Sequence, residues 1–266
     1  MPPYNNIIHE CHINDGTFGQ VHKFKMGSKT LAIKFFKNDI YFKHELDVLK
    51  YIKNNIYKND NNANICFLNY YREAKNENNL SYIAFDYYDY DLLTYKNNFV
   101  LNDSDILEIC LQICNGLKYL HKIKIVHCDL KPENILCGYK QGRLNIGITD
   151  FGLSYYENQT ITNEIVTKYY RSPELIYAIK NKFILIKPSI DMWSFGIIIY
   201  YLKYNDVLPN NIYHINEYIK NNPIKQMQNL ESIINRLLQY EQNRYDSSAI
   251  YVELKYLQSY NLYIVL

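Results

Sequence analysis

Along the first 86 residues, hydrophobic positions come in short runs separated by glycine-containing turns. Runs of this length, rich in β-branched and aromatic residues, are typical of strands. A single stretch, residues 41–52, has its apolar positions at helical spacing and predicts one helix. The pattern therefore predicts a strand-rich region with strands at 7–13, 20–24, 30–36, 68–73 and 82–86.

After residue 86, apolar positions recur mainly at the spacing of helices. Asn102 precedes the longest such segment and offers a side-chain oxygen as an N-cap. A strand-rich part followed by a helix-rich part favours the α+β class and two lobes, which we place at residues 1–86 and 87–266. The second lobe is predicted to hold helices at 106–121, 189–202, 230–238 and 247–257, strands at 135–137 and 144–148, and an irregular stretch at 152–173.

Composition and charge argue against several classes of protein. Hydrophobic residues make up 48% of the 266 positions, which is enough to bury a sizeable core. The net charge of +2 gives no electrostatic reason to expect nucleic acid or an anionic membrane as the main partner. The chain opens without a secretory signal pattern, and its longest apolar run, 197–202, is too short to span a bilayer. We therefore expect an intracellular, cytoplasmic protein, with nuclear entry left open.

The chain contains six cysteines, and none of them forms a C-x-x-C pair. A chain of this length does not need disulfides for stability, so we expect reduced thiols. Cys110 and Cys114 stand about one helical turn apart and could share a metal ion. Two core thiols on one face of a helix are the simpler interpretation.

The first segment with candidate chemistry is the glycine-rich turn between the first two predicted strands, residues 14–21. Gly16 and Gly19 let backbone N–H groups approach phosphate oxygens without a side chain in the way. Asn14 stands where the usual G-x-G-x-x-G pattern has its first glycine. Such a turn also fits an ordinary β-hairpin, so it gains weight only from the rest of the sequence.

Lys34 ends the apolar strand sequence Leu-Ala-Ile-Lys. A buried ammonium group needs a partner of opposite charge. Glu45, in the following predicted helix, opens an E-x-x-x-L pattern and is the acid that we expect to pair with Lys34. Such an ion pair would hold Lys34 against the phosphates of a nucleotide. The alternative is a lysine at a strand edge that points into solvent.

The strongest signal is the stretch Ile125–Leu136, which brings three polar side chains onto one short loop. Phosphoryl transfer needs a carboxylate near the acceptor hydroxyl, a cation near the transferred phosphate and a ligand for Mg²⁺. Asp129, Lys131 and Asn134 supply these groups. Asp150, sixteen residues after Asn134, supplies a second oxygen ligand of the kind that Mg²⁺ prefers. Core packing alone does not account for this combination.

Together these residues resemble the eukaryotic protein kinase family over essentially the whole chain. Residues 127–134 are similar to the catalytic loop, with Cys128 in place of the usual arginine. Asp150 opens a segment that resembles the metal-binding D-F-G motif, and residues 172–174 resemble the end of the activation segment. The resemblance implies a bilobal protein-kinase-like α+β fold, with a small β-rich N-lobe and a larger, mainly helical C-lobe.

The resemblance also implies roles for the polar residues. Asp129 would be the catalytic carboxylate and Lys131 the lysine that stabilises the γ-phosphate, with Asn134 and Asp150 as metal ligands. The implied cofactors are ATP and Mg²⁺, with Mn²⁺ as an alternative, and Asp91 would reach the ribose. For the apolar members of the nucleotide site, plain core packing is the alternative. The residues expected at the nucleotide are Asn14, Gly16, Gly19, Val21, Ala32, Lys34, Glu45, Asp86, Tyr88, Asp91 and Leu136.

Two further segments resemble parts of the family that support the catalytic loop. Residues 191–196 are similar to the buried helix on which that loop rests. Arg244 stands where the family has an arginine that pairs with the glutamate of the activation segment, here Glu174.

The end of the activation segment, residues 166–174, resembles the CMGC group of kinases. With His-Cys-Asp in the catalytic loop, it looks closest to the dual-specificity Tyr-regulated and homeodomain-interacting kinases. Thr167 and Lys131 follow the pattern of kinases that phosphorylate Ser or Thr in proteins. In the CMGC group Arg171 is associated with a preference for proline directly after the acceptor, so we expect that preference here.

Three departures from the family pattern lead to expectations of their own. Glu45 follows Lys34 by only 11 positions, so we expect a tight connection and no cyclin-type partner at this helix. Cys128 replaces the arginine that usually binds a phosphate of the activation segment. Thr162 occupies the position that cyclin-dependent and mitogen-activated kinases phosphorylate, and we predict activity without that modification. The stretch 202–230 is short, so the extra helical insert of the CMGC group is expected to be absent.

Three rival interpretations stay open. A pseudokinase would keep the fold as a binding module without chemistry; the substitution at Asn14 favours it, and the presence of the expected polar residues argues against it. A small-molecule kinase of related fold would not need the activation segment with Thr167, which fits protein substrates. An active kinase that acts mainly as a scaffold is an alternative on which the sequence is silent.

Overall fold

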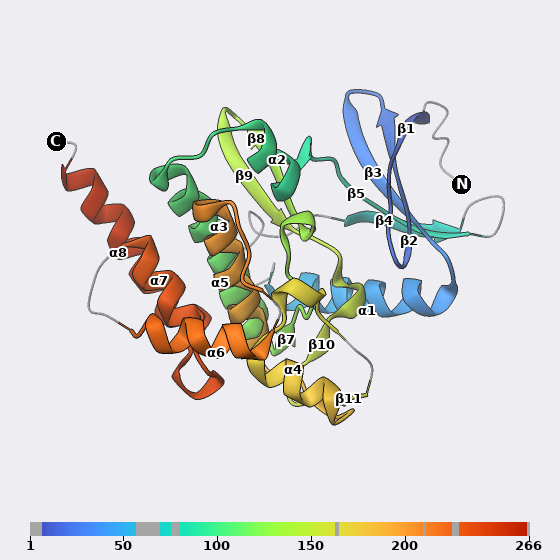
Figure 1. Cartoon of the computed structure of the whole chain (residues 1–266). Coiled ribbons are helices and arrows are strands. Elements are labelled where there is room, and N and C mark those ends of the chain that lie inside the picture. Colours follow the sequence, from blue (N-terminus) through green and yellow to red (C-terminus); the bar gives the residue numbers. More distant parts are fainter. Residues whose placement is uncertain are drawn as a thin grey trace.

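The computed structural model describes residues 7–56, 70–75, 80–162, 165–209, 211–224 and 229–264. Its elements fall into a strand-rich N-terminal part and a helix-rich C-terminal part. In Figure 1 the N-terminal sheet and α1 (Asp39–Ile56) lie on one side of the molecule, and most of the later helices lie on the other. The two-lobed α+β architecture expected from the sequence is confirmed.

The N-lobe is built on a five-stranded antiparallel sheet with the strand order β1-β2-β3-β5-β4. One face of the sheet packs on α1, where Phe36 and Ile83 join the same buried cluster as Leu49 of the helix. A smaller apolar cluster lies apart from this core. The strands are β1 (Ile7–Asp15), β2 (Gly19–Met26), β3 (Lys29–Phe36), β4 (Tyr70–Lys75) and β5 (Ser81–Asp86).

These strands match the hydrophobic pattern, although residues 68 and 69 of the predicted fourth strand lie outside the described part of the chain. The predicted helix at 41–52 is also present and extends further at both ends. Its start is fixed by Asn38, whose side-chain oxygen accepts the N–H groups of Ile40 and Tyr41 at 3.1 and 3.0 Å. Only Lys37 and Asn38 separate β3 from α1, so the tight connection that the sequence predicts is confirmed.

In the described residues of the C-lobe, all four helices that the sequence predicts are present, together with three that it does not predict. The additional helices, α2, α4 and α6, are short, and seven to ten residues contain too few apolar positions to establish a period. Helices of the C-lobe are α2 (Leu92–Asn98), α3 (Asp103–Lys122), α4 (Pro173–Lys180), α5 (Ser189–Tyr204), α6 (Ile212–Asn221), α7 (Leu230–Leu237) and α8 (Ser247–Ile264).

Short strand pairs complete the C-lobe and order part of the stretch 152–173 that the sequence leaves irregular. A three-stranded sheet has the order β6-β8-β9, and two isolated pairs join β7 to β10 and β11 to β12. Backbone pairing with distant segments, which a local pattern does not reveal, forms β10 and β11. The strands are β6 (Tyr90–Asp91), β7 (Ile125–Val126), β8 (Ile135–Lys140), β9 (Arg143–Ile148), β10 (Tyr155–Tyr156), β11 (Thr160–Ile161) and β12 (Ile184–Leu185).

Helix α5 forms the centre of the C-lobe. Its buried residues lie on nearly all sides of the helix, as expected for a helix that is hydrophobic all round. Trp193 and Phe195 are among the largest fully buried side chains of the protein. Gly196 lies against α7, since a Cβ added there would come within 2.8 Å of the Leu237 Cβ. The glycine therefore permits a close approach of the two helices.

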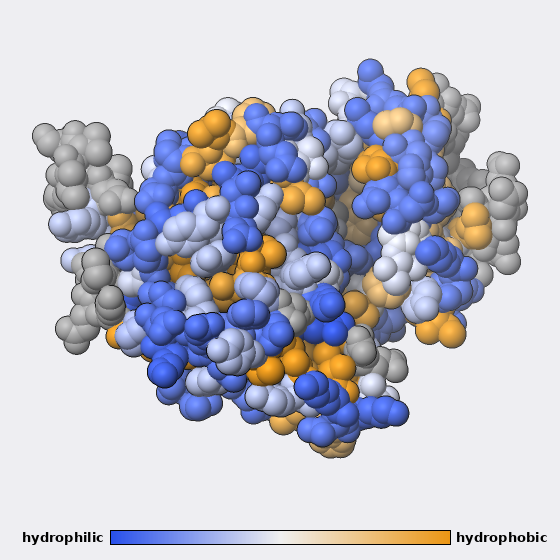
Figure 2. Space-filling model, in the orientation of Figure 1, coloured by the Kyte–Doolittle hydropathy of each residue, from blue (hydrophilic) through white to orange (hydrophobic). Residues whose placement is uncertain are grey.

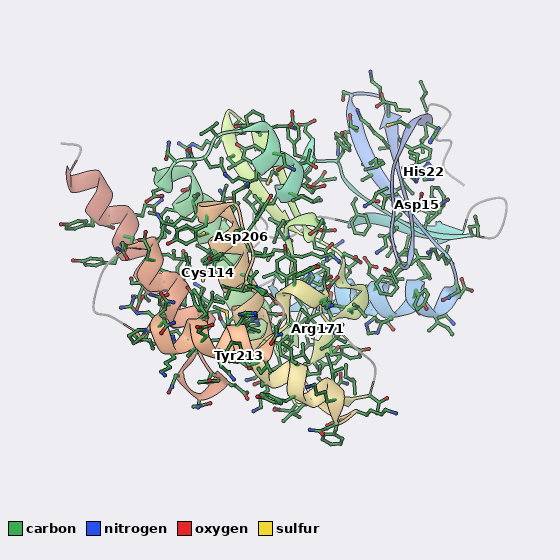
Figure 3. The ribbon with its side chains drawn as sticks, in the orientation of Figure 1. Asp15, His22, Cys114, Arg171, Asp206 and Tyr213 are labelled. Carbon is green, nitrogen blue, oxygen red and sulfur yellow. The ribbon has the colours of Figure 1, made fainter. Side chains whose placement is uncertain are left out.

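The two cysteines of α3 are core residues. Cys110 and Cys114 are both fully buried, and the Cys114 thiol donates to the backbone carbonyl of Ser247 at 3.3 Å. Figure 3 places Cys114 among the helices of the C-lobe. Among the described residues, no group of three or more His, Cys, Asp or Glu side chains is arranged to hold a metal ion. The core-thiol interpretation is confirmed.

The face of the protein seen in Figure 2 is mostly hydrophilic, with hydrophobic side chains in scattered patches. Within the described ranges, no helix has the length and apolarity that a membrane crossing requires.

Replacing Gly196 with alanine tests the packing of α5 on α7. Helix propensity alone would raise the free energy of unfolding by about 1 kcal/mol. The overpacking against Leu237 and Leu238 should outweigh this gain and lower that free energy by about 1–3 kcal/mol. Urea denaturation measures the difference, and a variant as stable as wild type or more stable would contradict the packing described.

Candidate active site

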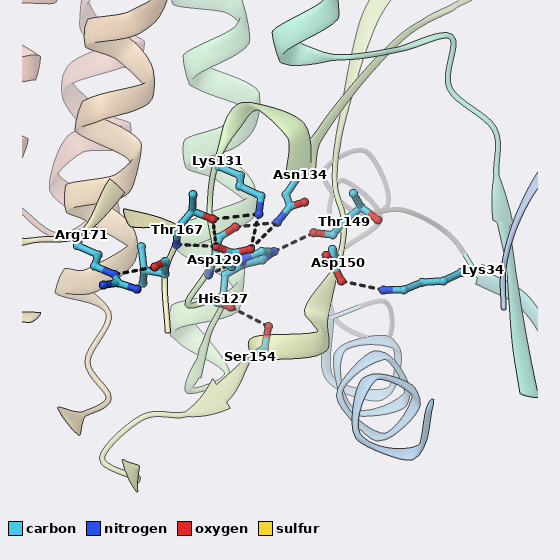
Figure 4. A network of polar contacts seen from close by, with 11 residues as sticks. Lys34, His127, Asp129, Lys131, Asn134, Thr149, Asp150, Ser154, Thr167 and Arg171 are labelled. Carbon is cyan, nitrogen blue, oxygen red and sulfur yellow. Dashed lines mark hydrogen bonds and ion pairs between the residues drawn. The ribbon is translucent and has the colours of Figure 1, made fainter. Parts of the chain in front are cut away.

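A buried ammonium group links three elements of the two lobes. The Lys34 Nζ of β3 donates to Glu45 Oε2 of α1 at 2.6 Å and to Asp150 Oδ1 at 2.8 Å. The side chain of Lys34 is 10% exposed and that of Glu45 only 1%, so both charges depend on this contact for compensation. The structure thus shows the Lys34–Glu45 pair that the sequence suggests and adds Asp150 to it. Figure 4 shows Lys34 reaching Asp150.

The three charged groups shift one another's pKa values. Burial raises the pKa of the Glu45 carboxyl to about 7, against the opposing effect of the Lys34 ammonium. Burial by itself would lower the pKa of Lys34, but the carboxylates of Glu45 and Asp150 outweigh it and raise that pKa. Burial would likewise raise the pKa of Asp150, yet the Lys34 ammonium lowers it. Glu45 is therefore the member of the cluster that titrates near neutral pH.

Asp150 is positioned by an unusual backbone conformation. Its φ of 62° lies in the left-handed region, which aspartate tolerates better than most residues. The preceding residue, Thr149, contacts His127 through a 2.9 Å bond between its carbonyl oxygen and His127 Nε2. The following Phe151 is buried, with its ring centroid 5.2 Å from that of His127. Asp150 is thus fixed relative to the catalytic-loop segment.

A second cluster gathers around the Asp129 carboxylate (Figure 4). Lys131 Nζ donates to Asp129 Oδ2 at 2.8 Å, and the Asn134 side-chain nitrogen donates to the Asp129 carbonyl at 2.8 Å. The hydroxyl and the backbone N–H of Thr167 donate to Asp129 Oδ1 at 2.8 and 2.9 Å. Lys131 Nζ also donates to the Thr167 hydroxyl at 3.0 Å. Four sequence-predicted residues therefore meet within hydrogen-bonding distance.

The loop that carries Asp129 rests on the N-terminal turn of α5. The two oxygens of the Asp191 carboxylate accept the backbone N–H groups of His127 and Cys128 at 2.8 and 2.9 Å. His121, which the sequence does not single out, contacts the same carboxylate at 3.0 Å. Cys128 has a φ of 64° and a fully buried thiol. Residues 191–196 therefore support the loop as their resemblance implies.

The end of the activation segment is held by two arginines. The Arg171 Nε donates to the carbonyl of Val166 at 2.9 Å, and Val166 has a φ of 64°, a rare conformation for a β-branched residue. Arg244, whose side chain is fully buried, pairs with both carboxylate oxygens of Glu174 at 2.5 and 3.0 Å. Thr162, by contrast, is exposed and lies just after β11. The structure does not bring it to the Asp129 cluster.

The residues expected at the adenine lie on strands of both lobes. In the N-lobe, Val21 is opposite Lys34 and Ala32 is opposite Phe85 in the sheet. In the C-lobe, Leu136 of β8 is opposite Asp91 of β6. The strand pairing shows which residues lie opposite each of these positions. Contact with a nucleotide stays a prediction for all of them.

Side chains of the segment that joins the lobes make contacts within the C-lobe, beside the nucleotide contacts that stay predictions. The Tyr88 side chain packs on the β8–β9 hairpin, where a Cβ on Gly138 would come within 3.2 Å of its ring and a Cβ on Gly147 within 3.0 Å of its hydroxyl oxygen. Asn145 donates to the Tyr88 hydroxyl at 2.7 Å. The Asp91 carboxylate caps α2 by accepting the N–H of Thr94 at 2.7 Å. Asp86 ends β5 and pairs with Leu31. Tyr88 and Asp91 thus have structural roles that spacing alone did not reveal.

The glycine-rich turn is a tight hairpin. Asn14 is opposite Val21 in the register, and the N–H of Gly16 donates to the carbonyl of Gly19 at 2.8 Å. Gly19 cannot be replaced without movement, because a Cβ there would lie 2.0 Å from the Phe35 carbonyl oxygen. This crowding is a physical reason for a glycine at this position that a G-x-G pattern does not supply.

The pKa of Glu45 predicts how stability depends on pH. Because the folded-state pKa of about 7 lies above the ordinary value of 4.5, folding favours the protonated form. The contribution of Glu45 to the free energy of unfolding is complete below its ordinary pKa of 4.5, and it is lost as the pH rises through its folded-state pKa of about 7. The free energy of unfolding of wild type should therefore fall relative to that of Glu45→Gln between about pH 5 and about pH 8. Urea denaturation at both pH values measures it, and a constant or growing difference would contradict the shift.

Comparisons with known proteins identify the family. A model of the protein kinase domain matches residues 8–259. A probable serine/threonine-protein kinase dyrk2 of Dictyostelium discoideum is 34% identical over 194 residues, which are 70% of this chain and 20% of that protein.

Two mammalian proteins show similar agreement. The human dual specificity tyrosine-phosphorylation-regulated kinase 4 is 31% identical over 70% of this chain and 35% of its own length. The rat serine/threonine-protein kinase ICK is 34% identical over 70% of this chain and 29% of its own length. The chain thus spans only about a fifth to a third of these relatives. With the matched domain covering nearly all of its length, the chain belongs to the protein kinase family.

Proposed function

We propose that this protein transfers the γ-phosphate of ATP to Ser or Thr hydroxyls of other proteins. The observation that carries the proposal is the Asp129 cluster, in which a carboxylate, the Lys131 ammonium and the Thr167 hydroxyl lie within 3.0 Å of one another. Phosphoryl transfer depends mainly on positioning and electrostatic stabilisation, and this cluster supplies both.

Each polar residue has a part that its contacts support. Asp129 would accept a hydrogen bond from the acceptor hydroxyl and orient it, because its carboxylate is already fixed by Thr167 and Lys131. Lys131 would place its positive charge beside the transferred phosphate. Lys34, held by Glu45, would contact the phosphates nearer the ribose.

The donor set at Asn134 and Asp150 fits Mg²⁺, a hard ion that prefers oxygen ligands. The Asn134 side-chain nitrogen donates to Asp129, which leaves the amide oxygen as the atom that would bind a metal. Asp150 offers a carboxylate whose pKa is lowered by Lys34, so it stays ionised. When bound, the ion would neutralise phosphate charge. Mn²⁺ would suit the same ligands.

Removing the Asp129 carboxylate tests the proposal. The Asp129→Ala variant should transfer phosphate from Mg²⁺-ATP to a generic basic protein about 100- to 10,000-fold more slowly than wild type. Radiolabelled ATP measures the rate, and circular dichroism checks that the variant is folded. Equal rates in the two proteins would remove the assignment of Asp129, and no transfer by folded wild type would favour a pseudokinase that binds nucleotide or partners without turnover.

The backbone next to Thr167 supports a preference for proline directly after the acceptor. The Val166 carbonyl already accepts the Arg171 Nε at 2.9 Å. A substrate N–H that passes this carbonyl would find its acceptor occupied, and an unpaired N–H is costly. Proline has no N–H and loses nothing at this position. Arg171 thus acts on specificity by using up an acceptor.

Substituting Arg171 should weaken this preference. Wild type should prefer a Ser-Pro peptide over the matched Ser-Ala peptide on the order of tenfold or more in kcat/KM. Arg171→Ala should lose most of the ratio because the Val166 carbonyl is released. Arg143→Ala, which removes an exposed arginine of the β8–β9 hairpin, is the matched control and should keep it. A ratio near one in wild type, or an unchanged ratio in Arg171→Ala, would refute the mechanism.

Backbone pairing supports activity without phosphorylation of Thr162. Thr160 and Ile161 form a strand pair with β12, and the Asn158 N–H donates to the Ile186 carbonyl at 2.8 Å. Further back, Tyr155 and its neighbour pair with β7. These backbone pairings hold the segment that precedes Thr162 at several points, and none of them involves a phosphate.

Thr162→Ala should therefore leave the turnover number within about twofold of wild type, as for a surface substitution. Steady-state kinetics on the basic protein substrate measures this. A loss of tenfold or more would show that modification of Thr162, and not backbone pairing alone, orders the segment.

A further inference from the structure

A small cavity opens on the C-lobe between side chains of α5, α6 and α7, and it shares no residue with the Lys34 or the Asp129 cluster. Its volume of about 240 Å³ lies below the range of about 300–1,000 Å³ that is usual for pockets of drug-sized ligands. A single small group would therefore fill it. Three of the residues that line it are tyrosines, and we refer to it as the tyrosine cavity.

The three tyrosine rings meet at steep angles. Tyr200 and Tyr204 stand about one turn apart near the end of α5, with their ring centroids 4.8 Å apart and their planes inclined by 56°. The Tyr218 ring of α6 lies 6.0 Å from the Tyr200 ring at 82°, which is nearly a right angle. Rings that are inclined in this way form a corner, in which one bound group can touch more than one ring.

Contacts among the helices hold the cavity open in advance of any ligand. The Tyr218 hydroxyl donates to Asn235 Oδ1 of α7 at 3.1 Å, which fixes the ring between the two helices. Asn222, at the end of α6, donates from its side chain to the Tyr218 carbonyl at 2.9 Å. The buried Ile234 adds an apolar surface to the lining. A preformed cavity loses little conformational freedom when a ligand enters.

The edge of the tyrosine cavity carries a surplus of negative charge. Glu231 lines the cavity and accepts the Lys203 Nζ at 3.2 Å. The same Nζ also pairs with the Asp103 carboxylate at 3.1 Å. Burial, and after it the Glu231 carboxylate, raises the pKa of the Tyr204 hydroxyl, so this charge acts on the aromatic side of the cavity. Two carboxylates thus share one ammonium group.

Aromatic rings beside a carboxylate suit one class of ligand. The face of an aromatic ring attracts a cation, and the attraction is stronger where water is excluded. A quaternary ammonium group carries its positive charge on methyl groups and has no N–H, so an apolar cavity leaves none of its hydrogen bonds unmade. A metal ion or an unmethylated ammonium group would lose its contacts with water there. The cavity therefore favours a methylated ammonium group over these cations.

We propose that the tyrosine cavity binds a methylated ammonium group, carried by a small quaternary amine or by a methylated lysine of another protein. Tyr200, Tyr204 and Tyr218 contact the methyl groups, and Glu231 compensates the positive charge. None of these residues belongs to the active site. The proposal therefore does not rest on the phosphotransferase function, and its test needs no kinase activity.

Choline and dimethylbutanol, its uncharged isostere with carbon in place of nitrogen, are the first probes. Amide chemical shifts of the full chain, followed by NMR at constant ionic strength, measure binding of each. Choline should shift the amides of Tyr204, Tyr218 and Glu231 to saturation, with a Kd at least on the order of tenfold below that of dimethylbutanol. Equal binding of the two probes, or shifts that do not saturate at the cavity, would refute the proposal.

A peptide that contains trimethyllysine distinguishes the two sources of the group. Tighter binding of this peptide than of choline would assign the cavity to a methylated lysine of a partner protein. Binding no tighter than that of choline would assign it to a free quaternary amine. The unmethylated peptide is the control, and it should bind at least on the order of tenfold more weakly than the trimethylated one. Equal binding of the two peptides would contradict the proposal.

Substitutions of the exposed Tyr204 test the role of the ring without disturbing the core. Tyr204→Phe keeps the ring and should bind choline within about twofold of wild type. Tyr204→Leu keeps an apolar side chain but removes the ring, and it should bind choline on the order of fivefold more weakly. Tyr213→Leu, which changes an exposed tyrosine of α6 outside the cavity, should bind as wild type does. Equal affinity of the Phe and Leu variants of Tyr204 would exclude a cation–π contact.

Glu231→Gln tests the charge at nearly constant shape. It should weaken the binding of choline at least on the order of threefold and leave that of dimethylbutanol unchanged. The matched control is Glu217→Gln, because Glu217 is an exposed glutamate of α6 that does not line the cavity. This control should bind both probes as wild type does, and circular dichroism checks that each variant is folded. An equal effect of Glu231→Gln on both probes, or no effect on either, would remove Glu231 from the site.

Discussion

The burial of the Lys34 ammonium is the interaction on which the rest of the site depends. A nearly buried positive charge must be compensated, and the compensating carboxylates come from α1 and from the segment after β9. Breaking either contact would leave a charge without its partner, which is far more costly than the loss of a surface ion pair. The requirement therefore fixes the position of α1 against β3 and that of Asp150 against both. It also explains why Glu45, although it titrates near neutral pH, is placed where water cannot reach it.

The short connection between β3 and α1 links this ion pair to the glycine-rich turn. Since Asn38 caps α1 directly after the strand, the first turn of the helix lies close enough for Tyr41 to contact Phe18. On the C-lobe side, the Asp191 carboxylate holds the Asp129 loop through two backbone N–H groups. The ion-pair cluster of Lys34 is thus anchored on α1 of the N-lobe, and the Asp129 cluster is anchored on α5 of the C-lobe. This anchoring supports our proposal that the arrangement assembles without a phosphate on Thr162, and the buried Cys128 in place of an arginine fits that proposal.

Much of the fold and of the site follows from local signals in the sequence. Strands with alternating or apolar runs, the capped helix α3 and the all-round hydrophobic helix α5 have patterns that their own residues determine. The Lys34–Glu45 ion pair could be predicted from the sequence because a buried lysine in an apolar strand needs a carboxylate partner. The short helices α2, α4 and α6 could not be found, since they hold too few residues for a hydrophobic period and depend on tertiary contacts, with side-chain caps at α2 and α6. The inward Tyr88 ring depends on glycines of the β8–β9 hairpin that are far away in the sequence, so no local pattern predicts it. The left-handed backbone of Val166 is held by the side chain of Arg171, a contact that hydrophobic spacing does not reveal.

The central claim is that Lys34, Asp150 and Asn134 form a site for a nucleotide with its metal ion. Isothermal titration of the unmodified chain with ATP, with and without Mg²⁺, tests it most directly. The account predicts binding that Mg²⁺ strengthens, and it predicts that Asp150→Asn, which removes the carboxylate charge while keeping the shape, loses most of the Mg²⁺ effect. Binding of equal strength with and without Mg²⁺, or no binding of ATP by the folded chain, would contradict it.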